Sequence, residues 1–100
     1  MHKDTRISKK QFLADVARRC GIHEQIVLEV YDAIVENIFD ELTKGHNVSL
    51  AGFGLFYVQK HKGHPVQFNG GNDKNVDDYL VLKFSASKNS NRRLREKNTI

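Results

Sequence analysis

The chain has 100 residues, of which 39% are hydrophobic, with 16 lysines and arginines against 12 aspartates and glutamates. A chain of this length is expected to form one domain with a modest core. No apolar run approaches the roughly 20 residues of a membrane span, and no signal-peptide core follows the first residues, so we expect a cytoplasmic protein without a membrane partner. The single cysteine, Cys20, excludes an intramolecular disulfide and is typical of a reducing compartment.

The spacing of apolar residues predicts a first helix over about 8–20. Ser8 and Gln11 form a capping-box pattern, in which each side chain is expected to satisfy the other's backbone N–H. Gly21 follows as a stop, and Cys20 is predicted to be a small buried residue that closes the apolar face of the helix.

A second, longer helix is predicted from near His23 to Lys44-Gly45. Its apolar stripe comprises Ile26, Val27, Val30, Tyr31, Ile34, Ile38, Phe39 and Leu42. This stripe is too wide for the first helix alone to cover, and the chain offers little else to pack on it. We therefore predict a homodimer.

After Gly45 the pattern changes to that of short strands. Residues 48–50 predict a strand, 51–52 a turn, 53–59 a second strand, and 79–84 a strand with alternating apolar residues. Together with the helices, these strands predict an α+β fold with a three-stranded antiparallel sheet.

The polar stretch 60–78 is long for a loop without secondary structure. If Phe56 pairs with Phe84, the midpoint of the pairing is residue 70, inside the turn-forming sequence 69–72. We therefore predict that the sheet extends into a two-stranded arm over 57–83.

The last predicted element is a short helix within 85–97, capped by Ser85 or Ser87, with Leu94 as its only apolar anchor. Most of the chain's net positive charge lies here. Residues 1–58 hold seven basic and eight acidic residues, and 59–100 hold nine basic and four acidic residues. The arm has only four lysines against three aspartates, so the basic helix is the best candidate for binding an anionic partner.

The two helices, Lys44-Gly45 and the segment Val48-Ser49-Leu50-Ala51-Gly52-Phe53-Gly54-Leu55-Phe56 resemble the HU and integration-host-factor family of bacterial and phage DNA-bending proteins. The resemblance covers roughly 8–96 and includes Phe84. It implies a single domain that forms an intertwined homodimer through 8–44 and the sheet of 47–84. It also implies β-arms that wrap the DNA minor groove, with a proline near each tip that kinks the duplex.

The chain departs from the family at the arm tip, where family members carry Gly-x-Asn-Pro-x-Thr-Gly. The only proline is Pro65, five residues before the midpoint of the hairpin. Either Pro65 or Phe68 is a candidate wedge, because aromatic and aliphatic side chains serve this role in other minor-groove binders. In the alternative, Phe68 packs across the hairpin and Pro65 protects an edge strand, so that neither residue intercalates.

We predict a histone-like protein, associated with the nucleoid, that binds double-stranded DNA with little sequence preference and bends or compacts it. The predicted DNA-binding residues are Lys60, Lys62, His64, Pro65, Phe68, Lys74, Lys83, Lys88, Arg92, Arg93 and Arg95. The arginines of the last helix are expected to bind phosphates between the arms.

Two other interpretations remain open. An HU-like dimer with a weakly charged arm is also compatible with a protein-binding scaffold that bends DNA less. Residues 13–22 resemble the start of a helix-turn-helix regulator, although the long, externally acidic second helix disfavours a recognition helix.

No catalytic triad or phosphate loop is apparent, so we expect no enzyme activity, cofactor or small-molecule substrate. His61 and His64 are expected to face opposite sides of a strand, which disfavours a metal site.

Overall fold

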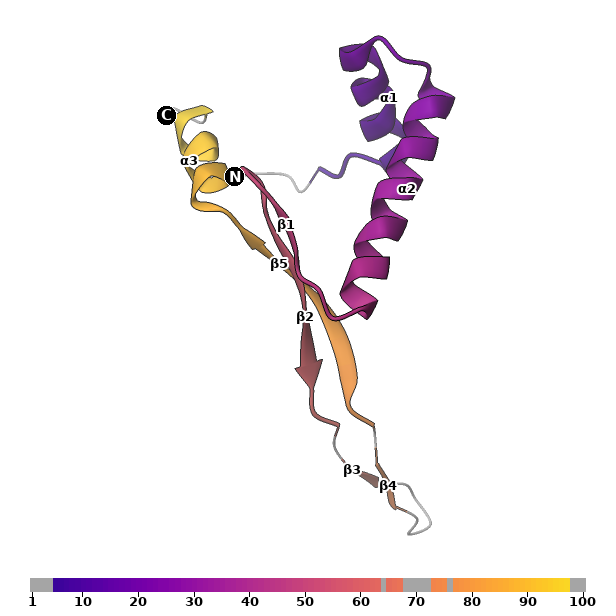
Figure 1. The fold of residues 1–100 in the computed structure, drawn as a ribbon, viewed down its shortest axis with the longest axis vertical. Coiled ribbons are helices and arrows are strands. Elements are labelled where there is room, and N and C mark those ends of the chain that lie inside the picture. Colours follow the sequence, from indigo (N-terminus) through magenta and orange to yellow (C-terminus); the bar gives the residue numbers. More distant parts are fainter. Residues whose placement is uncertain (1–4, 64, 68–72, 76, 98–100) are drawn as a thin grey trace. The chain divides into compact units, whose positions relative to one another are not determined.

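The computed structural model describes residues 5–63, 65–67, 73–75 and 77–97. Along the chain, two helices are followed by a β-rich segment and a third helix (Figure 1). The chain divides into two compact units, one ending at Phe39 and the other beginning at Asp40.

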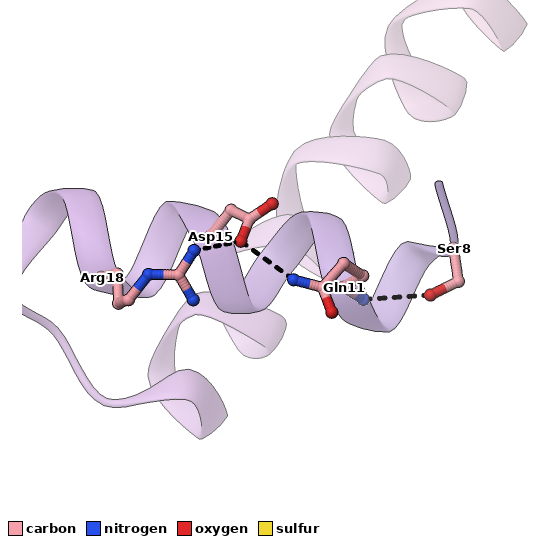
Figure 2. A network of polar contacts seen from close by, with 4 residues as sticks. All are labelled: Ser8, Gln11, Asp15 and Arg18. Carbon is pink, nitrogen blue, oxygen red and sulfur yellow. Dashed lines mark hydrogen bonds and ion pairs between the residues drawn. The ribbon is translucent and has the colours of Figure 1, made fainter. Parts of the chain in front are cut away.

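Helix α1 spans Lys9–Cys20 and begins as its sequence predicts. The Oγ atom of Ser8 accepts a hydrogen bond of 3.1 Å from the backbone N–H of Gln11, as an N-cap does. The predicted reciprocal bond, from the backbone N–H of Ser8 to the side chain of Gln11, is not formed. The Gln11 side chain instead donates to Asp15 at 3.0 Å, along the same helix face where Arg18 also pairs with Asp15 (Figure 2). An acceptor one helical turn ahead, at i+4, takes the amide away from the helix start.

The core of the first unit lies between α1 and α2. Leu13 and Ala17 of α1 are buried with Val27 of α2. The partly buried residues packed against them are Val16, Leu28 and Tyr31. Cys20, in contrast, is exposed, which contradicts its predicted burial. Cys20 is the last residue of α1, one turn beyond Ala17, and Gly21 ends the helix there with a φ of 67°.

Helix α2 spans Glu24–Thr43. At its start, the ring Nδ1 of His23 accepts a hydrogen bond of 3.0 Å from the backbone N–H of Gln25. At its end, Gly45 adopts a φ of 87° and its N–H donates to the carbonyl of Leu42 at 3.0 Å. The predicted helix and its glycine stop are therefore confirmed.

Charged side chains surround the end of α2. Nδ1 of His46 lies 2.8 Å from Oε1 of Glu41, and Nζ of Lys44 lies 3.7 Å from Oε2 of the same carboxylate. The hydrogen bond from His46, followed by the positive charge of Lys44, lowers the pKa of Glu41 below its ordinary value of 4.5.

The sheet has the order β1-β2-β5 and is antiparallel throughout. Strand β1 spans Val48–Leu50, β2 spans Gly54–His61 and β5 spans Tyr79–Ala86. Phe53 lies in the β1–β2 turn rather than in the strand, since its N–H donates to the Leu50 carbonyl at 2.9 Å. The second strand therefore begins one residue later than predicted and extends to His61.

The predicted register of the hairpin is confirmed. Phe56 is paired with Phe84. Beyond the sheet, β3 (Pro65–Gln67) pairs with β4 (Asp73–Asn75), with Pro65 opposite Asn75. Both ladders have the same midpoint at residue 70, so β3 and β4 continue the hairpin in one register as an arm (Figure 1). The turn at 69–72 lies outside the described residues.

Two different constraints explain the glycines on either side of Phe53. The rings of Phe53 and Phe56 lie 5.0 and 4.9 Å from the ring of Phe84. A Cβ on Gly54 would stand 2.5 Å from that ring and 2.6 Å from the Ser85 carbonyl oxygen, so any side chain at this position would force its neighbours to shift. Gly52 turns the chain between the strands with a φ of 82°.

A candidate nucleic-acid interface

Helix α3 spans Lys88–Lys97 and is attached to the β1–β2 turn by hydrogen bonds. The backbone N–H of Ser87 donates to the Phe53 carbonyl at 3.0 Å. The Ser90 hydroxyl lies 2.5 Å from the same carbonyl oxygen and 3.0 Å from that of Gly52. The Ser87 side chain also accepts from the Ser90 N–H at 3.0 Å. Of the two predicted caps, Ser87 is therefore the N-cap, and the start of α3 is fixed on the turn.

The basic residues of α3 lie on two faces. With about 100° between successive helical residues, Lys88, Arg92 and Arg95 form one stripe. Arg93 lies on the other side, where it lines a groove of about 280 Å³. The other residues of this groove are Phe53, Ser90, Leu94 and Lys97. The stripe of Lys88, Arg92 and Arg95, here called the outer stripe, thus points away from the turn that holds the helix.

The cations of α3 have no acidic partners in the described part of the chain. No carboxylate there lies within 4.0 Å of a side-chain nitrogen of this helix, although Lys9, Arg18, Lys44 and Lys60 each have one. Arg92 donates a hydrogen bond of 3.0 Å to the side-chain oxygen of Asn89, which is uncharged. The outer stripe therefore keeps its full positive charge facing solvent.

The lysines of the arm are arranged differently. Nζ of Lys60 lies 3.5 Å from Oδ2 of Asp78. Lys60 is paired with Leu80 in the ladder, and Lys83 is paired with Tyr57. The two pairs are an odd number of positions apart along the strands. Lys60 and Lys83 therefore lie on opposite faces of the hairpin. The structure does not bring these two predicted DNA-binding residues together.

The remaining predicted residues of the arm stay predictions. His64 and Phe68 lie outside the described residues. Pro65 and Lys74 belong to β3 and β4, which places them in the two paired strands of the arm but does not test either as a DNA contact. Lys62 follows β2 and precedes β3, and no ion pair is found for it in the described part.

Three residues in this region were not predicted from the sequence. Lys97 adds a cation beside Arg93 at the groove, and Ser90 attaches α3 to the turn. Asp78 neutralises Lys60. The i+4 spacing of Arg93 and Lys97 could have identified the first. The other two contacts join residues far apart in the sequence, Ser90 with Gly52 and Phe53, and Asp78 with Lys60.

A metal site and a membrane-spanning helix are both absent from the described ranges. No group of three or more histidine, cysteine, aspartate or glutamate side chains there has the arrangement to hold a metal ion. None of the helices described is both long and apolar enough to cross a membrane.

Comparisons with known proteins agree with this fold. A family model described as bacterial DNA-binding protein matches residues 7–95. DNA-binding protein HU of Campylobacter jejuni is 30% identical over 84 residues, which cover 83% of this chain and 86% of the relative. DNA-binding protein HRL18 of Rhizobium leguminosarum is 29% identical over 83 residues, covering 82% and 91%.

Solved structures of HU proteins are similar as well. An HU–DNA cocrystal structure from Anabaena has a TM-score of 0.74 at 22% identity, covering 89% of this chain and 98% of that one. An HU variant from Thermotoga maritima has a TM-score of 0.67 at 26% identity, covering 89% and 100%. The match to the family model over nearly the whole chain and the similarity to HU relatives show that this chain belongs to the HU family of bacterial DNA-binding proteins.

Proposed function

We propose that this protein binds double-stranded DNA with little sequence preference and compacts it as a nucleoid-associated, histone-like protein. The observation that carries this proposal is the outer stripe of α3, a row of cations without acidic partners in the described chain, on a helix that hydrogen bonds attach to the β1–β2 turn. Cations in this arrangement bind the phosphates of DNA whatever its base sequence, and they release condensed counterions as they do so. Membership of a DNA-binding family supports the same function.

The binding unit is a homodimer. Ile26, Val30 and Ile34 follow one another on α2 at i+4 spacing, and each is more than 50% exposed. In the described part from Asp40 onward, Leu42 is the only large apolar side chain that is buried. Exposed apolar surface of this extent marks an interface, and a second copy of the chain supplies a matching one.

The sheet offers a second surface for the partner. Leu80, Leu82 and Phe84 alternate along β5 on one face, and they are 69%, 47% and 43% exposed. Phe56 and Val58 of β2 are their ladder neighbours on that face. We propose that this face and the α2 stripe are covered together in an intertwined dimer, so that one domain is completed by two chains. Sedimentation of the free protein tests this, and a stable monomer would contradict it.

The arms are proposed to enter the minor groove and to bend the duplex. Either Pro65 or Phe68 is the wedge between base pairs. Replacing each by alanine and measuring the bend separates the two, because the wedge variant loses bend while keeping most of its affinity. If neither replacement changes the bend, neither residue is the wedge.

The experiment that tests DNA binding is a salt titration of affinity with a duplex of about 35 base pairs. Strong binding at low salt that weakens steeply as salt rises supports the proposal. Absence of binding at low salt would overturn it.

A second candidate function is a dimeric scaffold that binds proteins and bends DNA little. The pairing of Lys60 with Asp78 favours it, because this pair removes positive charge from an arm that has little. The same titration distinguishes the two functions, since a scaffold shows weak affinity and a shallow salt dependence.

A further inference from the structure

The two ladders of the arm are separated by a short break. The β2–β5 ladder ends at the pair of His61 with Tyr79, and the next ladder starts at the pair of Pro65 with Asn75. Lys62, Gly63, Asp77 and Asp78 lie in this break and belong to neither ladder.

The Asp78 carboxylate bridges the break with both of its oxygens. Oδ1 accepts a hydrogen bond of 2.9 Å from the backbone N–H of Gly63, on the opposite side of the arm. Oδ2 lies 3.5 Å from Nζ of Lys60. A side-chain oxygen thus satisfies a backbone donor where the ladder supplies no partner, and this holds the two sides of the arm together.

The register explains why Asp78 reaches Lys60. Lys60 is paired with Leu80, and Asp78 lies two residues before Leu80, so the two charged residues are diagonal neighbours on one face. Long side chains span such a diagonal. Asp77 is adjacent in sequence and carries the same charge, but its carboxylate makes no hydrogen bond or ion pair within the described part. Asp77 therefore offers a matched control.

We propose that Asp78 is a positioning residue of the arm, which ties its two strands together at the break and holds Lys60 out of contact with DNA phosphates. This inference rests on the proposed DNA binding. One carboxylate oxygen sets the direction in which the arm leaves the sheet. The other makes Lys60 a paired cation that releases no counterion when DNA binds.

The first test compares Asp78→Asn with Asp77→Asn. An asparagine oxygen still accepts from Gly63, but the attraction to Lys60 is lost, so Lys60 becomes free to bind a phosphate. We expect Asp78→Asn to steepen the dependence of log affinity on log salt by about 0.9 per protomer. Its affinity at low salt should exceed that of Asp77→Asn by about two- to five-fold, the range set by exposed ion pairs. Adding Lys60→Gln to Asp78→Asn should remove the gain.

The second test needs no DNA. Asp78→Ala removes both interactions, so hydrogen exchange at the Gly63 amide should accelerate, whereas Asp78→Asn and Asp77→Ala should leave it slow. This experiment reports on the positioning role even if the protein binds no DNA, so failure of the inference and failure of the proposed function are distinguishable.

Two results would overturn the inference. The first is equal salt dependence of Asp78→Asn and Asp77→Asn in a protein whose wild type binds DNA, which would show that Lys60 is not restrained. The second is unchanged Gly63 exchange in Asp78→Ala, which would show that the carboxylate does not hold the break.

Discussion

Helix α3 and the arm both contain basic residues proposed to bind DNA, but the two regions differ in whether these residues are paired with carboxylates. The outer stripe of α3 has no carboxylate within ion-pair distance in the described chain, and its backbone is fixed by Ser87 and Ser90. In the arm, Lys60 is paired with Asp78 and the ladder is interrupted. Net charge alone therefore does not locate a phosphate-binding surface. We infer that such a surface is marked instead by cations that lack acidic partners and lie on a backbone held by hydrogen bonds.

Removing charge from the outer stripe should have the largest effect. We expect the double variant Arg92→Gln and Arg95→Gln to flatten the salt dependence by about one unit for each phosphate that it no longer binds. The matched control is Lys9→Gln with Arg18→Gln, which removes two cations already paired with Asp32 and Asp15. Equal changes in the two double variants, measured by salt titration, would contradict a special role for α3.

Gly54→Ala should disturb the turn on which α3 rests. Its Cβ would lie 2.5 Å from the Phe84 ring and 2.6 Å from a backbone oxygen, so we expect a loss of about 1–3 kcal/mol in the free energy of unfolding. Denaturant unfolding measures this loss. Adding Phe84→Leu to Gly54→Ala relieves only the clash with the ring. The double variant should therefore lose less free energy of unfolding than the sum of the losses in the two single variants. A fully additive loss would show that the ring is not the obstacle.

Ser90→Ala tests rigidity without changing charge. It removes the hydroxyl bonds to the Phe53 and Gly52 carbonyls, worth about 0.5–1.5 kcal/mol of stability. DNA affinity should fall several-fold while its salt dependence stays the same, because every cation remains. Ser85→Ala, on an exposed strand position, is the control. A shallower salt dependence in Ser90→Ala would mean that the serine affects the number of phosphates bound.

The smallest effect is expected from the end of α2, far in sequence from both basic regions. Because folding lowers the pKa of Glu41, its contribution to stability is complete above the ordinary value of 4.5 and is lost as pH falls through the lowered pKa. His46→Ala should raise this pKa toward 4.5, and Lys44→Ala should raise it less. An NMR titration of the Glu41 carboxyl measures both, and an unchanged pKa in His46→Ala would contradict the assignment of the cause.

Local patterns in the sequence predicted much of the fold. Ser8, Gly21 and Gly45 mark helix ends that the structure confirms, because capping depends on residues close in sequence. The hairpin register followed from two phenylalanines and a central turn. Contacts between residues far apart in the sequence were harder to predict from such patterns. The place of Phe53 in the turn depends on packing with Phe84 and on anchoring of α3.

The candidate site was predicted less completely than the fold. The sequence located the basic helix but not its two faces or its attachment by Ser90, which requires a turn 37 and 38 positions away. It could not reveal that Lys60, one of the predicted DNA-binding residues, is paired with Asp78, because this contact depends on register and side-chain conformation together. Charges summed along a chain do not contain this information.

The proposed binding of DNA phosphates by the outer stripe of α3 is tested most directly by the salt dependence of wild-type affinity. With three cations in each protomer of the proposed dimer, we predict a slope of log affinity against log salt of about −5. A slope near zero, or no binding to duplex DNA at low salt, would contradict it.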